Sequence, residues 1–358
     1  GGAAIPAVAA DRLRHAEAAG TRAVQMAKTG GPTPAEIMTP EAFTNAFRVL
    51  LAIGGSTNGL VHMTAVAGRM GIKVDLEAID RLGQETPVLV DLKPSGQHYM
   101  EDLEKAGGLM TILRELKPLL HLDCMTVTGR TLGEEIEAAA PPFKQDVVRP
   151  FSDPLYPQGG IAVLRGNLAP EGAIVKQSAA TASLMTHTGR AVVFKNQEDL
   201  AARIDSPDLD VTPDDILIMQ NAGPKGAPGM PESGYLPIPK KLAATGVKDM
   251  LRMSDARMSG TAFGSIVLHI TPESYVGGPL GLVRDGDMIK LDVPNRSLDL
   301  LVDDAELERR RAEWSTPPAH EGSERGYLKL YMDHVQQADE GADFDFLAKA
   351  PDGRTTPV

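Results

Sequence analysis

A loop rich in glycine and proline ends in a carboxylate at Glu232, and this loop is the first candidate for chemistry. Residues 221–232 contain three glycines and three prolines and follow an apolar run at 216–219. Glycine lets a backbone approach a ligand closely, and proline restricts the loop to few conformations. A carboxylate oxygen on such a loop suits Mg²⁺, which tolerates little distortion of its ligands. The alternative is a tight surface loop that ends in a solvated glutamate.

The second candidate is Ser259, which lies in a stretch of small and polar residues at 253–264. Asp255 and Arg257 precede it, and an apolar run begins at residue 265. A serine in this setting can accept a proton if a metal ion or a positive field lowers the pKa of its hydroxyl. The alternative is an ordinary turn serine. A hydrolase triad is not supported, because the chain has no Gly-x-Ser-x-Gly elbow.

The third candidate is the turn formed by Gly54, Gly55, Ser56, Thr57 and Asn58, which leads into an apolar helical pattern. Backbone N–H groups at the start of a helix can hold a carboxylate or a phosphate. The turn lacks the lysine and the spacing of a P-loop. A glycine-rich turn that is capped by Ser56 or Thr57, with no ligand, is an equally good interpretation.

The remaining metal-binding residue types are scattered. No two of the eight histidines have the spacing of a zinc-binding motif, and we expect His62 and His269, in apolar stretches, to be packed and hydrogen-bonded. The lone cysteine, Cys124, excludes an internal disulfide and a complete iron–sulfur ligand set within this chain, and indicates a reducing compartment. We expect Cys124 to be a buried structural residue and the protein to be cytoplasmic.

Bulk composition bounds the kind of protein and its partners. The length of 358 residues predicts two domains. The net charge of −12 disfavours nucleic acid and anionic membranes as partners, although a local field can still favour a small anionic substrate. No apolar run is long enough to span a membrane. Residues 7–28 carry many charges and predict a solvated helix, which is unlike a signal peptide.

The hydrophobic pattern changes near residue 150. The first part reads as helices with short breaks, with helix starts at Thr33 and Thr39 and one short strand at 88–90. Beyond a proline- and glycine-rich linker, short β-type runs occur at 161–164, 173–175, 191–194, 216–219, 265–270, 288–291 and 298–301. The tail at 327–338 reads as a helix. We therefore predict an α/β amino-terminal part (1–155) followed by a β-barrel-like carboxy-terminal domain (156–358) that carries Glu232 and Ser259 on loops at one rim.

Taken together, these segments resemble the family that contains dihydroxyacid dehydratase, phosphogluconate dehydratase and the pentonate and hexonate dehydratases. The resemblance rests on the joint order and spacing of residues 4–7, 53–58, 159–168, 223–232, 254–260, 276–279 and 283–287. Met230-Pro231-Glu232 and the sequence at 254–260 are similar to the sugar-acid branch, as is the tail at 325–347. The chain is similar to the carboxy-terminal portion of such an enzyme, with residues 1–155 as the end of its cluster-bearing domain.

The resemblance implies a hydro-lyase that converts a pentonate, such as L-arabinonate or D-xylonate, into its 2-keto-3-deoxy acid. It implies an iron–sulfur cluster, expected to be of the 2Fe–2S type, that assists departure of the 3-hydroxyl, and a Mg²⁺ that holds the carboxylate and the 2-hydroxyl. Glu232 becomes a Mg²⁺ ligand, and Ser259 becomes the base that takes the proton from C2. The cluster cysteines of the family lie outside this chain. A homo-oligomer, dimeric or tetrameric, is implied as well.

Three alternatives stay open. The chain could act as the dihydroxyacid dehydratase of branched-chain amino-acid synthesis, although that enzyme usually carries an arginine before the glutamate that corresponds to Glu232. It could be a cluster-less homologue with a binding or scaffold role. It could also be a different lyase or an aldolase that uses Mg²⁺ alone. The presence of both Glu232 and Ser259 favours the sugar-acid dehydratase, because a binding module has no need for a base beside a metal ligand.

Overall fold

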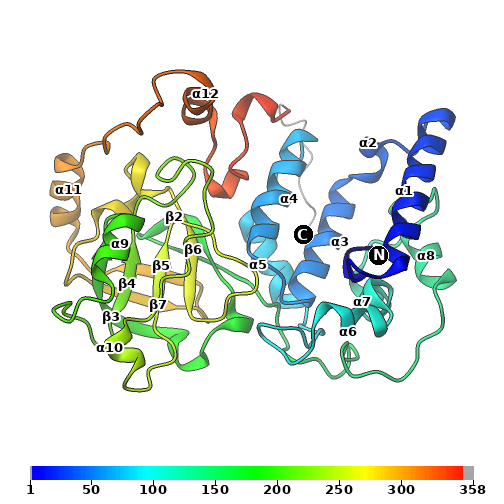
Figure 1. The fold of residues 1–358 in the computed structure, drawn as a ribbon, viewed down its shortest axis with the longest axis horizontal. Coiled ribbons are helices and arrows are strands. Elements are labelled where there is room, and N and C mark those ends of the chain that lie inside the picture. The colour runs from blue at the N-terminus through cyan, green and yellow to red at the C-terminus, as the bar shows by residue number, and fades with distance from the viewer. Residues whose placement is uncertain (1, 350–358) are drawn as a thin grey trace. The chain divides into compact units, whose positions relative to one another are not determined.

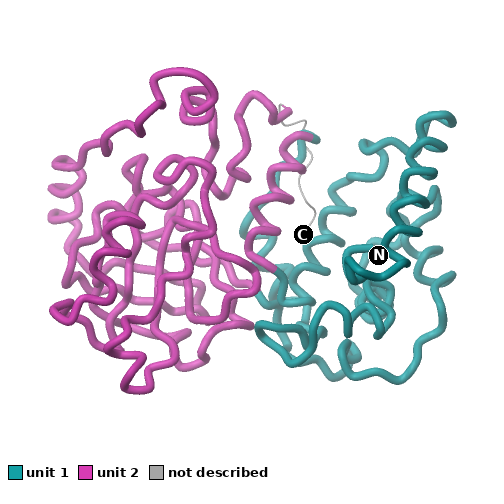
Figure 2. Tube along the Cα trace, viewed as in Figure 1, with its two compact units in different colours: residues 1–55, 70–160, 351–358 teal, residues 56–69, 161–350 magenta. Residues whose placement is uncertain are grey.

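The computed structural model describes residues 2–349, which divide into two compact units (Figures 1 and 2). Of the described residues, the first unit contains 2–55 and 70–160, and the second contains 56–69 and 161–349. The chain therefore contributes a short segment, residues 56–69, to the second unit before it completes the first. The expected domain boundary between residues 155 and 156 remains a prediction.

The first unit is helical. Its α-helices are α1 (Ala10–Thr29), α2 (Pro34–Ile37), α3 (Pro40–Ala52), α5 (Leu76–Glu85), α6 (Met100–Lys105), α7 (Gly108–Leu116) and α8 (Leu132–Ala138). The predicted starts are confirmed: Thr33 forms a capping box with Glu36, and the Thr39 hydroxyl accepts a hydrogen bond from Ala42 N at 3.3 Å. The segment at 88–90 is extended, but it pairs only through isolated bridges to Tyr156 and Val148.

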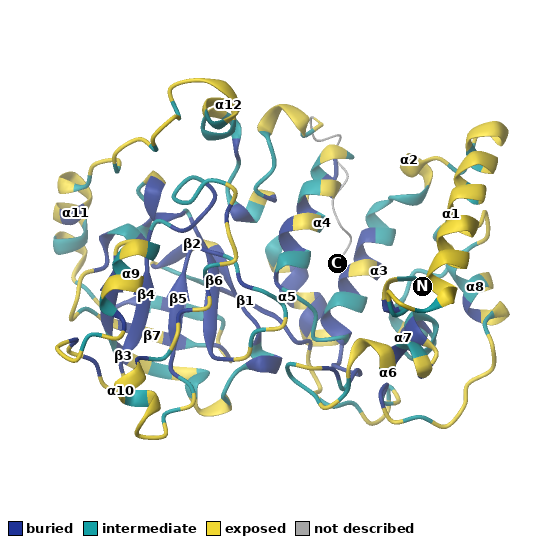
Figure 3. Ribbon diagram, in the orientation of Figure 1, coloured by how far each residue is buried: buried dark blue, intermediate teal, exposed yellow. Residues whose placement is uncertain are grey.

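Helix α1 is solvated, as the sequence predicts. None of its residues is buried (Figure 3). The core of the first unit lies elsewhere, where Leu89 and Val90 of the extended segment pack against Leu103, Ile112 and Leu116. Within residues 2–349, no helix combines the length and the hydropathy that a membrane crossing requires.

The second unit is built around a closed barrel of eight strands, which confirms the expected β-barrel-like carboxy-terminal domain. The strands are β1 (Ala162–Gly166), β2 (Ala169–Val175), β3 (Thr186–Phe194), β4 (Ile216–Met219), β5 (Arg252–Ser254), β6 (Ile266–Thr271), β7 (Met288–Asp292) and β8 (Ser297–Leu300). Their order around the barrel is β1-β2-β6-β5-β4-β3-β7-β8. Closure leaves no unpaired strand edge, so that the sheet needs no covering layer to protect an edge.

Side-chain alternation divides each strand between an inner and an outer core. In β4, Ile216 and Ile218 belong to the cluster that fills the barrel, and Leu217 and Met219 pack with a second cluster outside it. This two-sided burial explains why β4 reads as a continuous apolar run in the sequence.

Strands β3, β4, β5 and β6 run parallel to one another. Since a parallel pair cannot be joined by a hairpin, the chain must return from the end of one strand to the start of the next. The connection at 220–251 joins β4 to β5, and the connection at 255–265 joins β5 to β6. Both pass over the outer surface of the barrel, where Leu236 and Ala256 pack with Leu217 and Met219. Glu232 therefore lies in the first of these connections and Ser259 in the second. Both connections start at one rim of the barrel and then cross its outer surface.

Strand β5 was not among the expected strands. It is only three residues long and begins with Arg252, which is 1% exposed. The guanidinium is stabilised inside the protein because Asp249 pairs with it at 2.6 Å. Because the strand is so short and begins with a charged residue, its hydrophobic pattern does not predict a strand.

Helices surround the barrel. They are α4 (Asn58–Arg69), α9 (Gln197–Arg203), α10 (Lys240–Ala243), α11 (Asp304–Glu313) and α12 (Gly326–His334). The expected tail helix at 327–338 ends at His334, and a short 3-10 helix (Ala338–Glu340) follows it. This 3-10 helix packs on α4, the early segment of the chain that belongs to the second unit.

Candidate active site

The loop that leads to Glu232 is held in shape by a buried carboxylate. Glu273, which follows β6 and is 1% exposed, accepts hydrogen bonds from Lys225 N at 3.0 Å and from Gly226 N at 2.8 Å. Gly223 is required beneath it, because a Cβ at this position would lie 2.6 Å from the Glu273 carboxylate. The glycines predicted from the sequence to permit close backbone approach thus permit approach to a protein side chain.

Asp255 ties together the segments that follow β4, β5 and β6. Its buried carboxylate accepts one hydrogen bond from Ala222 N at 2.9 Å and another from Ser274 N at 2.8 Å. Burial nevertheless raises the pKa of Asp255. Because the carboxyl ends of parallel strands meet at one rim, a side chain from the middle segment can bond to the other two there.

The pKa of Glu273 makes the stability of this region depend on pH. Burial and the neighbouring Asp255 raise the pKa of Glu273 to about 7. A carboxyl whose pKa is higher in the folded state than in the unfolded state stabilises the fold at low pH. Its contribution is complete below the unfolded value near 4.5 and is lost as the pH rises through about 7.

We expect Glu273→Gln to abolish this part of the pH dependence. The difference in unfolding free energy between the wild type and the variant should change by about 3 kcal/mol between pH 4.5 and pH 7. Urea unfolding at several pH values measures this difference, and other titrating groups cancel because both proteins contain them. Glu17→Gln, on the exposed helix α1, is the control and should leave the slope unchanged. Parallel curves for the wild type and Glu273→Gln would show that Glu273 titrates normally.

Ser259 is half-buried in the connection at 255–265. Its Oγ lies 3.0 Å from the Thr261 hydroxyl and accepts a weak hydrogen bond from Thr261 N at 3.4 Å. The next carbonyl, that of Gly260, accepts a hydrogen bond at 3.2 Å from the ammonium group of Lys176. These contacts leave a lone pair of the Ser259 hydroxyl for a proton transfer, and they place a cation beside the next residue.

The turn at 56–58 bridges the two connections. Asn58 donates a hydrogen bond from its Nδ2 to the Glu232 carboxylate. Ser56 packs against Gly260 so closely that a Cβ at Gly260 would lie 2.6 Å from the Ser56 Cβ. The structure therefore brings together all three candidate segments, although residues 56–58 are more than 170 positions from Glu232 in the sequence.

Within the turn, the three candidate residues have different roles. Ser56 Oγ accepts a hydrogen bond from Asn58 N at 3.2 Å, so Ser56 caps the start of α4 as the simpler interpretation predicts. Thr57 is 2% exposed and packs beneath the turn. Asn58 is the residue of this turn whose side chain bonds to another candidate residue, Glu232.

Glu232 and Asn58 have the donor atoms that a Mg²⁺ ion requires. Glu232 is exposed and supplies carboxylate oxygens, and the Oδ1 of Asn58 is buried without a hydrogen-bond partner. An unsatisfied amide oxygen beside a carboxylate fits a hard cation, since Mg²⁺ prefers oxygen ligands. Two residues do not complete an octahedral shell, and residues 2–349 contain no cluster of three or more histidine, cysteine or carboxylate side chains arranged as a metal site.

The described residues do not fit an iron–sulfur cluster. Cys124 belongs to the first unit, is half-buried and lies 3.6 Å from the amide nitrogen of Asn45. Burial and the nearby Asp123 raise the pKa of its thiol, which disfavours the thiolate that binds iron. Cys124 is less buried than we expected.

Arg257 and two histidines form a group that the sequence did not reveal. Arg257 donates from Nε to the Met230 carbonyl, and its Nη1 lies 3.4 Å from Nε2 of His62. His62 is exposed, which corrects the expectation of a packed side chain. His269 is buried as expected, but its Nε2 has no hydrogen-bond partner, and burial lowers its pKa to about 3. It therefore stays neutral at physiological pH.

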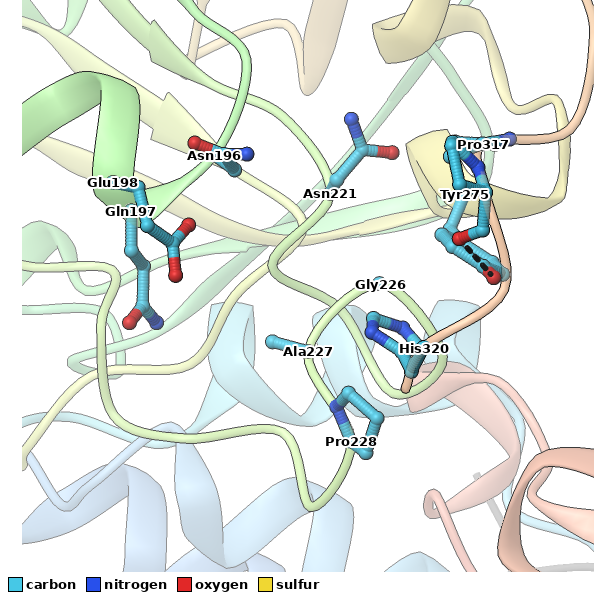
Figure 4. A pocket seen from close by; sticks show the side chains of 11 residues that line it. Asn196, Gln197, Glu198, Asn221, Gly226, Ala227, Pro228, Tyr275, Pro317 and His320 are labelled. Atoms are coloured by element: carbon cyan, nitrogen blue, oxygen red, sulfur yellow. Dashed lines mark hydrogen bonds between the residues drawn. The ribbon is translucent and has the colours of Figure 1, made fainter. Parts of the chain in front are cut away.

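Two cavities flank the loop that ends at Glu232. One, of about 370 Å³, lies between α4 and the tail and is lined in part by His62, Met230, Arg257 and Tyr331. The other, of about 440 Å³, is lined by Gly226, Ala227 and Pro228 of the same loop (Figure 4). Its wall includes His320, which stacks on Tyr275 with ring centres 5.2 Å apart and lies 2.8 Å from the Lys225 carbonyl. Residues of this loop therefore line both cavities.

The chain matches two family models that together cover most of its length. Residues 1–135 match the model described as dihydroxy-acid/6-phosphogluconate dehydratase N-terminal, and residues 146–342 match the corresponding C-terminal model. It is 50% identical over 349 residues to an L-arabinonate dehydratase of Rhizobium leguminosarum, which covers 97% of this chain and 60% of that protein.

Other relatives have different named substrates. A 6-deoxy-6-sulfo-D-gluconate dehydratase of Pseudomonas putida is 46% identical over 97% of this chain and 60% of that protein. A dihydroxy-acid dehydratase of Methanothrix thermoacetophila is 42% identical over 95% of this chain and 62% of that protein. The chain thus spans about three fifths of the length of the curated relatives that it matches.

Proposed function

The chain belongs to the dihydroxy-acid/6-phosphogluconate dehydratase family, and we propose on that basis that it acts as a hydro-lyase on a sugar acid. The proposed substrate is a pentonate, such as L-arabinonate or D-xylonate, and the product is its 2-keto-3-deoxy acid. The observation that carries the proposal is the meeting of three segments, where Asn58 bonds to Glu232 and Ser56 packs on the residue after Ser259.

Ser259 is the proposed base. Its ionised Oγ takes the proton from C2 of the substrate, the C–H electron pair forms the C2–C3 double bond, and the 3-hydroxyl leaves with the electron pair of the C3–O bond. The departing hydroxide becomes water by taking up a proton from solvent, and Ser259 later returns the C2 proton to solvent. The resulting enol then gains a proton at C3 and becomes the 2-keto acid. A serine hydroxyl has a pKa far above neutral, so this step requires positive charge close to the oxygen.

Glu232 and Asn58 are the residues of this chain that would hold a Mg²⁺ ion. When bound, the ion supplies a positive charge that favours the ionised serine and orients the carboxylate and 2-hydroxyl of the substrate. Asn58 has a second role, because its Nδ2 orients the Glu232 carboxylate. The iron–sulfur cluster that the family resemblance implies has no set of ligands among the described residues, so we derive no step through it.

A substrate screen tests the proposal. The complete protein, reconstituted anaerobically with iron, sulfide and Mg²⁺, should release 2-keto-3-deoxy acid from L-arabinonate or D-xylonate faster than from 6-phosphogluconate. It should also act on these pentonates faster than on 2,3-dihydroxyisovalerate, and keto-acid formation by chromatography gives the rates. Preference for dihydroxyisovalerate would instead assign the enzyme to branched-chain amino-acid synthesis, and no turnover of any 2,3-dihydroxy acid would refute dehydration.

A further inference from the structure

Lys176 is a buried lysine whose ammonium group bonds to the residue that follows the proposed base. It follows directly after β2, is 3% exposed, and donates a hydrogen bond from its ammonium group to the Gly260 carbonyl at 3.2 Å. Fully buried lysines are rare unless they are paired with a carboxylate. Among the described residues, Lys176 forms no ion pair, and its one hydrogen bond is to a neutral carbonyl.

The charged groups of the neighbouring segments are occupied elsewhere. Asp249, near the end of the connection at 220–251, pairs with Arg252 and accepts hydrogen bonds from Thr181 and Ser265. Arg257, in the connection at 255–265, donates a hydrogen bond to the Met230 carbonyl. Burial alone lowers the pKa of Lys176 to about 8, so the group keeps its proton at neutral pH. The ammonium is therefore a buried positive charge without a counter-charge.

The Lys176 ammonium bonds to the backbone at the residue that follows Ser259. Gly260 is the next residue after Ser259, its carbonyl accepts the Lys176 hydrogen bond, and Ser56 fills the space that a Cβ of Gly260 would occupy. A further anchor lies four residues along, where Gly264 N donates to the Ala179 carbonyl at 2.9 Å, in the short 3-10 helix that follows Lys176. The segment that carries Ser259 is thus fixed at two points to residues 176–179, which follow β2, and one of these points carries a full positive charge.

We propose that Lys176 is a positioning residue for Ser259, which holds the Ser259–Gly260 backbone in place and favours the ionised form of the serine hydroxyl through its charge. The anion that compensates the buried ammonium is the Ser259 oxyanion, which forms transiently when the base is active. This inference rests on the proposed role of Ser259 as the base. It adds a source of positive charge that belongs to the chain itself and is present without any metal ion.

Three variants and two measurements test the inference. Lys176→Met removes the charge and keeps most of the side-chain length, Lys176→Arg keeps the charge, and Lys290→Met repeats the first substitution at an exposed position on β7. The first measurement is the rate at which phenylmethanesulfonyl fluoride labels Ser259, followed by peptide mass spectrometry, because this reaction reports the ionised hydroxyl and needs no substrate. The second is the dependence of kcat on pH in the complete, reconstituted protein.

We expect Lys176→Met to slow Ser259 labelling and to lower kcat by roughly 10- to 100-fold, with little change in KM. In the wild type, kcat should fall above pH of about 8, where Lys176 loses its proton. This decline should be absent in Lys176→Met, and in Lys176→Arg it should move to higher pH with most of the activity restored. Lys290→Met should behave like the wild type in both measurements.

A merely structural role gives a different result. If Lys176 only stabilises the fold, Lys176→Met lowers the melting temperature, but the pH profile keeps its shape and Ser259 is labelled at the wild-type rate. That outcome, or a wild-type Ser259 that is not labelled, would overturn the inference. If no sugar acid is dehydrated but labelling still depends on Lys176, the proposed function fails while the coupling of Lys176 to Ser259 stands.

Discussion

Ser259→Ala should lower kcat for the dehydration of a pentonate by at least about 10³-fold, which is within the range that a positioned general base contributes. The reason is that the alanine cannot accept the C2 proton, and Thr261 offers no substitute because its exposed hydroxyl serves as a partner of Ser259. The measurement is kcat of the reconstituted complete protein, together with deuterium exchange at C2 of the substrate in deuterated water.

The fold should tolerate this substitution. The Ser259 side chain forms only a 3.0 Å contact with the Thr261 hydroxyl and a 3.4 Å hydrogen bond with Thr261 N, so its loss should cost no more than about 1 kcal/mol. Ser206→Ala is a matched control, because Ser206 likewise accepts a hydrogen bond from the N–H two residues ahead, at 3.3 Å. Substantial activity in Ser259→Ala, or an equal loss in Ser206→Ala, would argue against Ser259 as the base.

Glu232→Gln should weaken Mg²⁺ binding by roughly 10- to 100-fold, because the substitution keeps the shape of the ligand and removes its charge. Activity should then require correspondingly more Mg²⁺ and should recover in part at high concentration. Isothermal titration with Mg²⁺ and the Mg²⁺ dependence of kcat give two independent values for the change in affinity.

The fold should again be unaffected, because Glu232 is exposed and its hydrogen-bond partner is the side chain of Asn58. Glu324→Gln, at another exposed position, controls for the general loss of one negative charge. Unchanged Mg²⁺ affinity in Glu232→Gln would remove Glu232 from the metal site. The buried Oδ1 of Asn58, which has no hydrogen-bond partner, would then not be explained by a metal ion bound to Glu232.

Some of the candidate residues could be identified from the sequence, and others could not. Glu232 and Ser259 each lie in a stretch of unusual composition next to an apolar strand, so a local pattern could find them. Lys176 has no such signal, since a lysine after a strand is normally exposed. Its position became notable only when the structure showed that it is 3% exposed and bonded to Gly260.

The histidines show the limit of local patterns most clearly. His62 and His269 both lie in apolar stretches, and the sequence therefore predicted the same packed environment for both. The structure buries His269 and exposes His62, because the face of α4 that carries His62 lines a cavity instead of packing in a core. Burial depends on which neighbour covers a residue, and that neighbour is distant in the sequence.

The sequence by itself determined the succession of helices and short strands except β5, the turn chemistry at Thr33 and Thr39, and the two segments that carry Glu232 and Ser259. These features depend on side-chain periodicity and backbone preference within a few residues. Only the tertiary structure decided that β4, β5 and β6 run parallel, so that both segments cross the outside of the barrel. It also brought Asn58 and Lys176 into contact with them, because tertiary packing, and not local pattern, brings distant residues together.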